Sequence, residues 1–257
     1  MEILVCVKRV PTVGCVLTLT ADQRAIDMRT SGFTISPHEE CAVEEAVRLV
    51  ERFGGSVTVA SLGPVAAEEQ LRACLALGAS AAVLLETPDG VETGPIATAA
   101  ALHALAAADS FDLVLLGNEA SDTGGYQVGI RLAHLLGRPV ATGIKAITVA
   151  DDGTSLSASR TYRGVVETFT LALPCVMTVK EGINLPRYPS LPGRLRAKRA
   201  SIGRAPVTDA AAVTARDVRM IRLRVPDAPK KQATVLGHGP AAVPALVAVL
   251  AEIGVLS

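Results

Sequence analysis

The chain has few of the side chains that mark a disulfide framework, a metal site or a stacking platform for bases. It has no Trp, and aromatic residues make up 3% of its 257 residues. Its five cysteines are widely spaced without a CxxC motif, and its four histidines show no metal-ligand spacing. No apolar run reaches the roughly 18 residues of a membrane span, and the first ten residues do not resemble a secretory signal. We therefore expect a cytoplasmic protein whose thiols are buried and whose core consists of Ala, Val, Leu and Ile.

Charge is balanced overall but unevenly distributed. The formal net charge is zero, yet residues 1–183 hold 13 basic and 21 acidic side chains, whereas residues 184–257 hold 12 and 4. This pattern predicts that the basic tail meets an acidic surface, either on its own body or on another chain. Nucleic acid is the less favoured partner, because the tail offers a single aromatic, Tyr188, and no recognised nucleic-acid motif.

Strand-like and helix-like segments alternate through the first 140 residues. Ser36-Pro37-His38-Glu39 is a capping box with proline at the first helical position, and it predicts the start of a helix. Such alternation favours an α/β fold with a three-layer, doubly wound, mostly parallel sheet of the Rossmann-like, adenine-nucleotide-binding kind. The expected strands are 3–7, 57–62, 81–85 and 112–116, and the expected helices are 37–53, 65–77, 95–108 and 125–136.

The character of the chain changes after residue 140. Four strand-like runs follow (144–149, 155–162, 165–171 and 175–179), and turn signals at Asp151-Asp152-Gly153 and Arg163-Gly164 predict a β-hairpin region. Beyond residue 184 the chain is rich in proline and poorly periodic until a last helix near 241–253. We therefore expect a nucleotide-binding α/β domain over 1–183 and, over 184–257, an extended C-terminal arm that packs on a partner.

One loop has the composition of an anion-binding site. Residues 117–129 read GNEASDTGGYQVG, with four glycines between a strand and a helix, so backbone amides are left free at a positive helix end. With Val7–Arg9 and Ser36–Glu39 it should meet the carboxyl edge of the sheet, where such folds bind ligands. The loop matches neither GxGxxG nor the Walker pattern, so an ordinary strand-to-helix turn is the alternative.

Groups that could perform catalysis are scarce. The sequence contains no G-x-S-x-G, no H-E-x-x-H and no evident Cys/His pair. His38 belongs to the capping box, where a solvated histidine at a helix start is the simpler interpretation. The pattern favours a carrier or binding protein over a hydrolase.

Several blocks of the sequence resemble one family. They are VCVKRV at 5–10, Pro37 with AVEEAVRL at 42–49, LALGA at 75–79, DLVLLG at 112–117 and, most specifically, NLPRYPSLP at 184–192, which is similar to N-E-P-R-Y-x-x-L-P. On these motifs, which run from residue 3 to about 200, the chain is identified as a member of the electron transfer flavoprotein (ETF) beta-subunit family.

The resemblance implies a heterodimer with an ETF alpha subunit that carries most of the FAD site. Such a dimer accepts electrons from acyl-CoA-type dehydrogenases, as in fatty acid oxidation, and passes them to a membrane ETF-quinone oxidoreductase. The beta subunit of the family holds a structural AMP. The AMP positions carried over are Cys6, Ser36, Pro37, His38, Glu39, Leu62, Asp122, Gly125, Tyr126, Gln127, Val128 and Gly129.

The AMP loop departs from the family pattern. Asn-Gln-Thr-Gly is usual where this chain has Tyr126 to Gly129, so Val128 lacks a hydroxyl that could hold phosphate. Gln-Val-Gly is instead similar to the electron-bifurcating subgroup, which binds a second FAD here, although Ile130 stands where that subgroup has Pro. AMP is the favoured ligand; a second FAD remains open, as does a stand-alone adenine-nucleotide-binding module.

The resemblance also assigns roles outside the nucleotide loop. Leu191 matches the leucine of the loop that docks on partner dehydrogenases, and the family has a basic stretch beside it, here Arg194, Arg196, Lys198 and Arg199. Val13 and His38 fall where the family often has aromatics near the flavin, and Arg160 keeps a basic residue of the family. Thr161 replaces a Glu that pairs with the mobile flavin domain in many members.

Overall fold

The computed structural model describes residues 1–12, 14, 18–27, 29, 31–91, 93–207, 220–225 and 233–256. Val13, one of the two residues expected near flavin, lies outside these ranges. The chain separates into two compact units, residues 1–221 and residues 222–257. Within the described residues no helix is long and apolar enough to cross a membrane.

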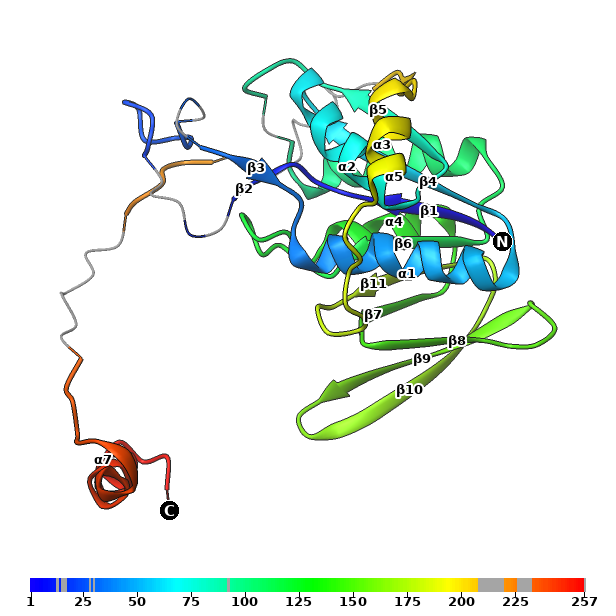
Figure 1. Cartoon of the computed structure of the whole chain (residues 1–257). Helices are drawn as coiled ribbons and strands as arrows, with labels where there is room; N and C mark the ends of the chain where they lie inside the picture. The colour runs from blue at the N-terminus through cyan, green and yellow to red at the C-terminus, as the bar shows by residue number, and fades with distance from the viewer. Residues whose placement is uncertain are drawn as a thin grey trace. The chain divides into compact units, whose positions relative to one another are not determined.

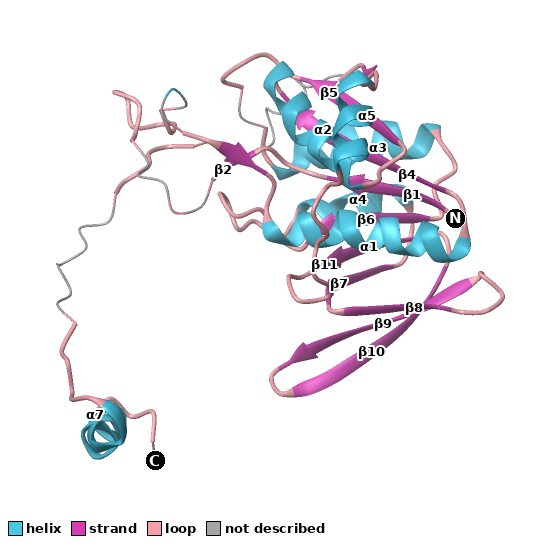
Figure 2. Cartoon of the chain, in the orientation of Figure 1, coloured by secondary structure: helices cyan, strands magenta, loops and turns pink. Residues whose placement is uncertain are grey.

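A seven-stranded sheet forms the centre of the first unit (Figures 1 and 2). All its strand pairs are parallel, and β1 lies between β4 and β6. Its inner strands are buried runs of Val, Leu, Ile and Cys, as expected when both faces of a parallel sheet are covered. The order is β12 (Gly203–Ala205), β5 (Ala81–Glu86), β4 (Ser56–Gly63), β1 (Glu2–Cys6), β6 (Leu113–Gly117), β11 (Cys175–Val179) and β7 (Val140–Ile144).

Helices cover both faces of this sheet and build two cores. α1 (Pro37–Phe53) and α2 (Glu68–Leu77), the latter preceded by the short η2 (Val65–Ala67), bury Val43, Ala46 and Leu71 against one face. α3 (Pro95–Ala108) and α4 (Val128–Leu136) bury Leu102 and Leu132 against the other. The expected doubly wound α/β fold is therefore confirmed.

A three-stranded antiparallel sheet follows the α/β layers in the sequence. It has the order β10 (Val165–Ala172), β9 (Ser155–Tyr162) and β8 (Ala146–Val149). Both expected turns are present: Gly153 has a φ of 68°, and Arg163 and Gly164, which join Tyr162 to Val165, have φ values of 51° and 79°. The hairpin region is confirmed, while β7 and β11 belong to the parallel sheet. β2 (Val10–Pro11) and β3 (Phe33–Thr34) form a separate two-stranded antiparallel ribbon.

The segment after residue 184 contains structure that the sequence pattern did not indicate. α5 (Leu191–Arg199) packs on α2, and β12 extends the parallel sheet beside β5. Only Gly193 and Ala197 of α5 are buried, so the helix has no stripe of large apolar residues that periodicity could detect. In the second unit, η3 (Gly239–Ala242) leads into α7 (Val243–Glu252), which confirms the expected last helix.

Candidate nucleotide site

Three segments meet at the carboxyl edge of the parallel sheet, beyond β1 and β6. Lys8, just after β1, pairs with Asp122 of the loop between β6 and α4, with 2.6 Å between Nζ and Oδ2. Ser36, at the start of α1, accepts a hydrogen bond from the Ser121 amide at 3.0 Å through its hydroxyl oxygen. These two contacts hold neighbouring residues of the loop, and residues 123–127 remain exposed beyond them.

The start of α1 supplies the polar groups that face this loop. The expected capping box is present, and the Ser36 amide donates to the Glu39 carboxyl group at 3.1 Å. Pro37 occupies the first helical position, where its missing N–H costs nothing. The capping box therefore fixes both Ser36, which holds the loop, and Glu39, which lies beneath it.

Buried groups at this edge are predominantly uncharged at neutral pH. Glu39 is 6% exposed, and burial raises its pKa to about 8, although hydrogen bonds from the Lys8 and Ser36 amides favour the carboxylate. Burial, assisted by Glu39, raises the pKa of the Cys6 thiol to about 12. The edge consequently presents amides and hydroxyls without a buried negative charge, which suits an anionic ligand.

Two glycines of the loop are required by close packing. A Cβ on Gly117 would lie 2.8 Å from Cγ of Glu39, and a Cβ on Gly129 would lie 2.4 Å from Cγ2 of Thr178. Both distances are shorter than real Cβ contacts allow, so the loop and the first turn of α4 approach α1 and β11 only because a side chain is absent. The glycines thus set the position of the free amides at the start of α4.

The middle of the loop is open. Nothing lies within 4 Å of a Cβ built on Gly125, and Tyr126, with a φ of 56°, is 52% exposed. Gln127 precedes α4 and accepts hydrogen bonds from Arg131 at 2.9 and 3.1 Å. Val128 and Gly129 form the first helical residues, so the amides of this stretch point from a positive helix end.

His38 contributes a buried polar ring atom to this edge. Its Nδ1 is buried without a hydrogen bond within the part of the chain that the structure describes. Burial lowers its pKa, and Lys180 and Lys145 act in the same direction, against the opposing charges of Glu119 and Glu181. A neutral imidazole with an unsatisfied ring nitrogen is a suitable contact for a ligand group at this edge.

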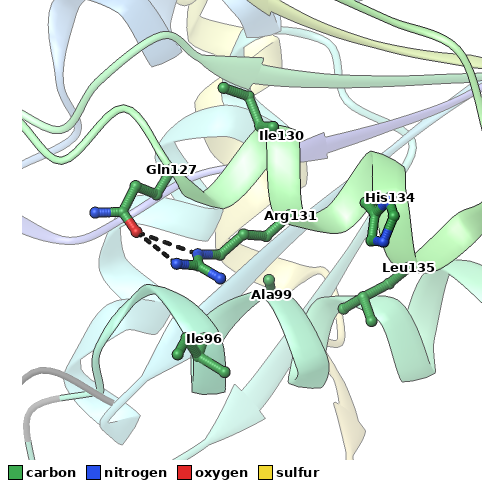
Figure 3. Close-up of a pocket in the computed structure, with 7 residues that line it drawn as sticks. All are labelled: Ile96, Ala99, Gln127, Ile130, Arg131, His134 and Leu135. Carbon is green, nitrogen blue, oxygen red and sulfur yellow. Dashed lines mark hydrogen bonds between the residues drawn. The ribbon is translucent and has the colours of Figure 1, made fainter. Parts of the chain in front are cut away.

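A pocket of about 400 Å³ lies between α3 and α4, next to the loop (Figure 3). Gln127 and Arg131 lie at one end of it, and its remaining lining residues are Ile96, Ala99, Ile130, His134 and Leu135. The pocket therefore adds apolar space beside Gln127, the N-cap residue of α4, on the face of the sheet opposite α1.

The remaining expected residues lie away from the loop contacts. Cys6 ends β1 and Leu62 lies in β4, one strand along the same edge. Leu191 begins α5 and is 71% exposed; the exposed basic side chains of that helix are Arg194, Arg196, Lys198 and Arg199. Arg160 is tied within the subunit to Glu167 at 2.7 Å and to Thr142, while its neighbour Thr161 is exposed.

Comparison with known proteins decides the family. Residues 25–210 match the model of the electron transfer flavoprotein domain. The chain belongs to this family. It is 36% identical to the Electron transfer flavoprotein subunit beta of Bradyrhizobium diazoefficiens over 81% of its own length and 83% of the relative's. It is 35% identical to the human subunit beta over 79% and 80% of the two chains. It is 40% identical to that of Bacillus subtilis over 64% of each, a little under two thirds.

Sequence reasoning missed two polar contacts that complete the site of this family member. The Lys8–Asp122 pair joins residues 114 positions apart, and no spacing rule connects them. The Thr178 hydroxyl donates to Asn118 Oδ1 at 2.8 Å and accepts from the Gly143 amide at 3.1 Å, which links β11 to the loop and to β7. The one available signal in the sequence was position. These residues lie near or beyond the carboxyl ends of parallel strands, which meet at the same edge of the sheet.

Proposed function

We propose that this chain is the beta subunit of a heterodimeric electron transfer flavoprotein, paired with an alpha subunit that carries most of the FAD site. The dimer accepts electrons from acyl-CoA-type dehydrogenases and delivers them to a membrane quinone oxidoreductase, and the chain has no catalytic turnover of its own. The observation that carries this proposal is the loop at residues 117–129 of a chain of this family. Lys8 and Ser36 hold this loop, and it offers free amides beside α1 and β1.

The proposed ligand of the loop is AMP. Amides from Gly125 to Gly129 would hold the phosphate, Gln127 would add a side-chain contact, and backbone groups of Cys6 and Leu62 would meet the adenine edge. The fit rests on three features: uncrowded amides at Gly125, a largely neutral Glu39, and an unpaired His38 nitrogen. Bound there, AMP would supply structural cross-links between the strands of the sheet edge and would take no part in electron transfer.

A second FAD in place of AMP is the alternative ligand. The apolar pocket beside Gln127 favours it, since a longer dinucleotide needs space beyond a phosphate cradle. Val128 favours it as well, because the hydroxyl expected of the AMP-binding form is absent. In either case His38 is proposed to lie near the flavin that the alpha subunit holds, where it would contribute a polar, neutral edge.

Nucleotide analysis of the intact complex tests the proposal. The chain is co-expressed with an alpha-type subunit, the complex is purified and denatured, and the released nucleotides are quantified. We expect one FAD and one AMP per dimer. Two FAD without AMP would establish the alternative ligand, and a chain that is stable alone, without flavin or alpha subunit, would support a stand-alone nucleotide-binding module instead.

Leu191 is proposed to be a docking anchor for the dehydrogenase. Its side chain is 71% exposed although it begins a helix held against α2. Truncation of a central apolar anchor commonly costs about 2 kcal/mol or more, or roughly 30-fold in affinity. Leu191→Ala should therefore raise the KM of an acyl-CoA dehydrogenase for the complex about 30-fold, while kcat, flavin content and the thermal midpoint stay unchanged. An unaltered KM would contradict the assignment.

A further inference from the structure

Leu191 is the last of three apolar residues that repeat at a fixed spacing. Between β11 and α5 the chain reads Leu185-Pro186, Tyr188-Pro189 and Leu191-Pro192. Three residues is the period of a polyproline II helix, in which such residues project from the same side. A residue before proline is biased toward extended backbone, which limits the backbone freedom of Leu185 and Tyr188, whereas Leu191 is the first residue of α5.

All three apolar side chains are exposed to an unusual degree. The exposed fractions are 83% for Leu185, 94% for Tyr188 and 71% for Leu191. Large apolar side chains that gather into an exposed patch commonly mark an interaction site. We call this set the apolar ridge.

The backbone beneath the ridge is fixed to α1 by an ion-pair clamp of Arg187 with Glu44 and Glu51, of which the Glu44 side chain is buried. Arg187, between Leu185 and Tyr188, donates from Nε and from its amide to Glu44 at 2.8 and 3.1 Å, and its guanidinium also meets Glu51 at 2.6 Å. Burial would raise the pKa of Glu44, which is 2% exposed, but hydrogen bonds from Arg187 and Arg48 outweigh it and lower the pKa. The Glu44 carboxylate thus stays charged and bound to Arg187.

Further contacts fix both ends of the segment. At the start, Asn184 donates to the Cys41 carbonyl at 3.0 Å and to Glu45 at 2.9 Å. At the end, the Ser190 hydroxyl accepts from the Gly193 amide at 3.1 Å, and Arg72 donates at 2.9 Å to the carbonyls of Ala197 in α5 and of Ala200, which follows the helix. Figure 1 shows this segment crossing α1 on its way to α5. A surface held this rigidly loses little entropy on binding.

Charge beside the ridge indicates what kind of surface it meets. Arg194, Arg196, Lys198 and Arg199 of α5 are exposed, and none forms an ion pair with any residue that the structure describes. Exposed arginines elsewhere in the unit, such as Arg52 and Arg163, also lack an ion pair with a described residue, but on α5 four such cations lie within one nine-residue helix. The free cations therefore complement a partner whose apolar groove has acidic residues at its rim.

We propose that Leu185 and Tyr188 extend the docking surface of Leu191 into a three-residue ridge for an apolar, acid-rimmed groove on the donor dehydrogenase, and that Arg187 is its positioning residue. This rests on the proposed electron-transfer function. Leu185 stands where the similar motif N-E-P-R-Y-x-x-L-P has Glu, whereas Tyr188 and Leu191 match the motif, so the apolar residue that this chain adds to the ridge is Leu185. The partner groove should accordingly be longer, and less basic at the end that meets Leu185, than the groove of a partner whose flavoprotein has Glu at this position.

The experiment uses the purified complex and a purified acyl-CoA dehydrogenase with its acyl-CoA substrate, and measures kcat, KM and direct binding to the immobilised dehydrogenase. Leu185→Ala and Tyr188→Ala should each raise KM at least fivefold with kcat unchanged. Arg187→Lys keeps the positive charge but loses the bidentate contact. It should also raise KM at least fivefold, with kcat and flavin content unchanged. Val165→Ala, at a 62% exposed apolar residue of β10 outside the proposed docking surface, is the control and should leave KM unaltered.

The outcomes separate this proposal from the function on which it rests. If Leu191→Ala raises KM while Leu185→Ala and Tyr188→Ala do not, the ridge is overturned and the single anchor stands. If Arg187→Lys leaves KM unchanged while the apolar changes raise it, the ridge stands and the positioning role is overturned. If the unaltered complex neither binds the dehydrogenase nor accepts its electrons, the proposed function itself is contradicted, and the ridge with it.

Discussion

Gly129→Ala should release most of the nucleotide from the complex. The new Cβ would lie 2.4 Å from Cγ2 of Thr178, a buried β-branched side chain of β11 whose hydroxyl bonds to Asn118 and the Gly143 amide oppose its rotation. The first turn of α4 would have to move, and with it the amides of Gln127, Val128 and Gly129. Overpacking of this kind costs about 1–3 kcal/mol, which corresponds to a loss of nucleotide affinity of roughly 5- to 150-fold.

A second change tests the cause directly. Thr178→Ser removes Cγ2 but keeps the hydroxyl that bonds Asn118 and the Gly143 amide. The double variant Gly129→Ala/Thr178→Ser should therefore regain most of the nucleotide, while Thr178→Ser alone should retain it. The measurement is the amount of nucleotide per dimer after denaturation, together with rebinding of AMP to the stripped complex. Full nucleotide content in Gly129→Ala would show that the start of α4 does not hold the ligand.

The layered architecture could be predicted because each element carries its own local signal. β1 and β6 are short apolar runs, α1 has a capping box at Ser36, and glycine follows α1, α2 and α4. The turn signals of the hairpin region were equally local. α5 could not be predicted, because it is held by Ser190, by Arg72 and by the small buried residues Gly193 and Ala197 rather than by an apolar stripe.

The site was predictable in position but not in its electrostatics. The strand ends and the glycine loop indicated where a ligand would bind, since these segments share one sheet edge. The Lys8–Asp122 pair and the burial of Glu39 arise only when segments distant in sequence come together. The same holds for the ion-pair clamp. Glu44 and Arg187 are separated by 143 positions in the sequence, and only the fold shows that the buried Glu44 carboxylate bonds to the Arg187 guanidinium.

Glu39→Gln should change how the stability of the complex depends on pH. The pKa of Glu39 is about 8 in the folded chain, against an ordinary value of 4.5, so the folded state binds more protons than the unfolded state between these values. Stability from this group is therefore fully present below about pH 4.5, is lost as the pH rises towards 8, and changes no further above it. The slope is about 1.4 kcal/mol per pH unit at most, and the total loss is a few kcal/mol.

Gln keeps the hydrogen bond from the Ser36 amide through its own side-chain oxygen but cannot ionise. Between pH 6 and 8.5 the thermal midpoint of the wild-type complex should therefore fall several degrees further than that of Glu39→Gln, given about 2–4 °C per kcal/mol for a domain of this size. Asp151→Asn, in an exposed turn, is the control and should follow the wild type.

Because an ionised Glu39 would also repel a phosphate at the same edge, AMP retention should decrease above pH 8 in the wild type and stay level in Glu39→Gln. Parallel pH profiles for the two proteins would mean that Glu39 is already charged at neutral pH and that the site tolerates this charge.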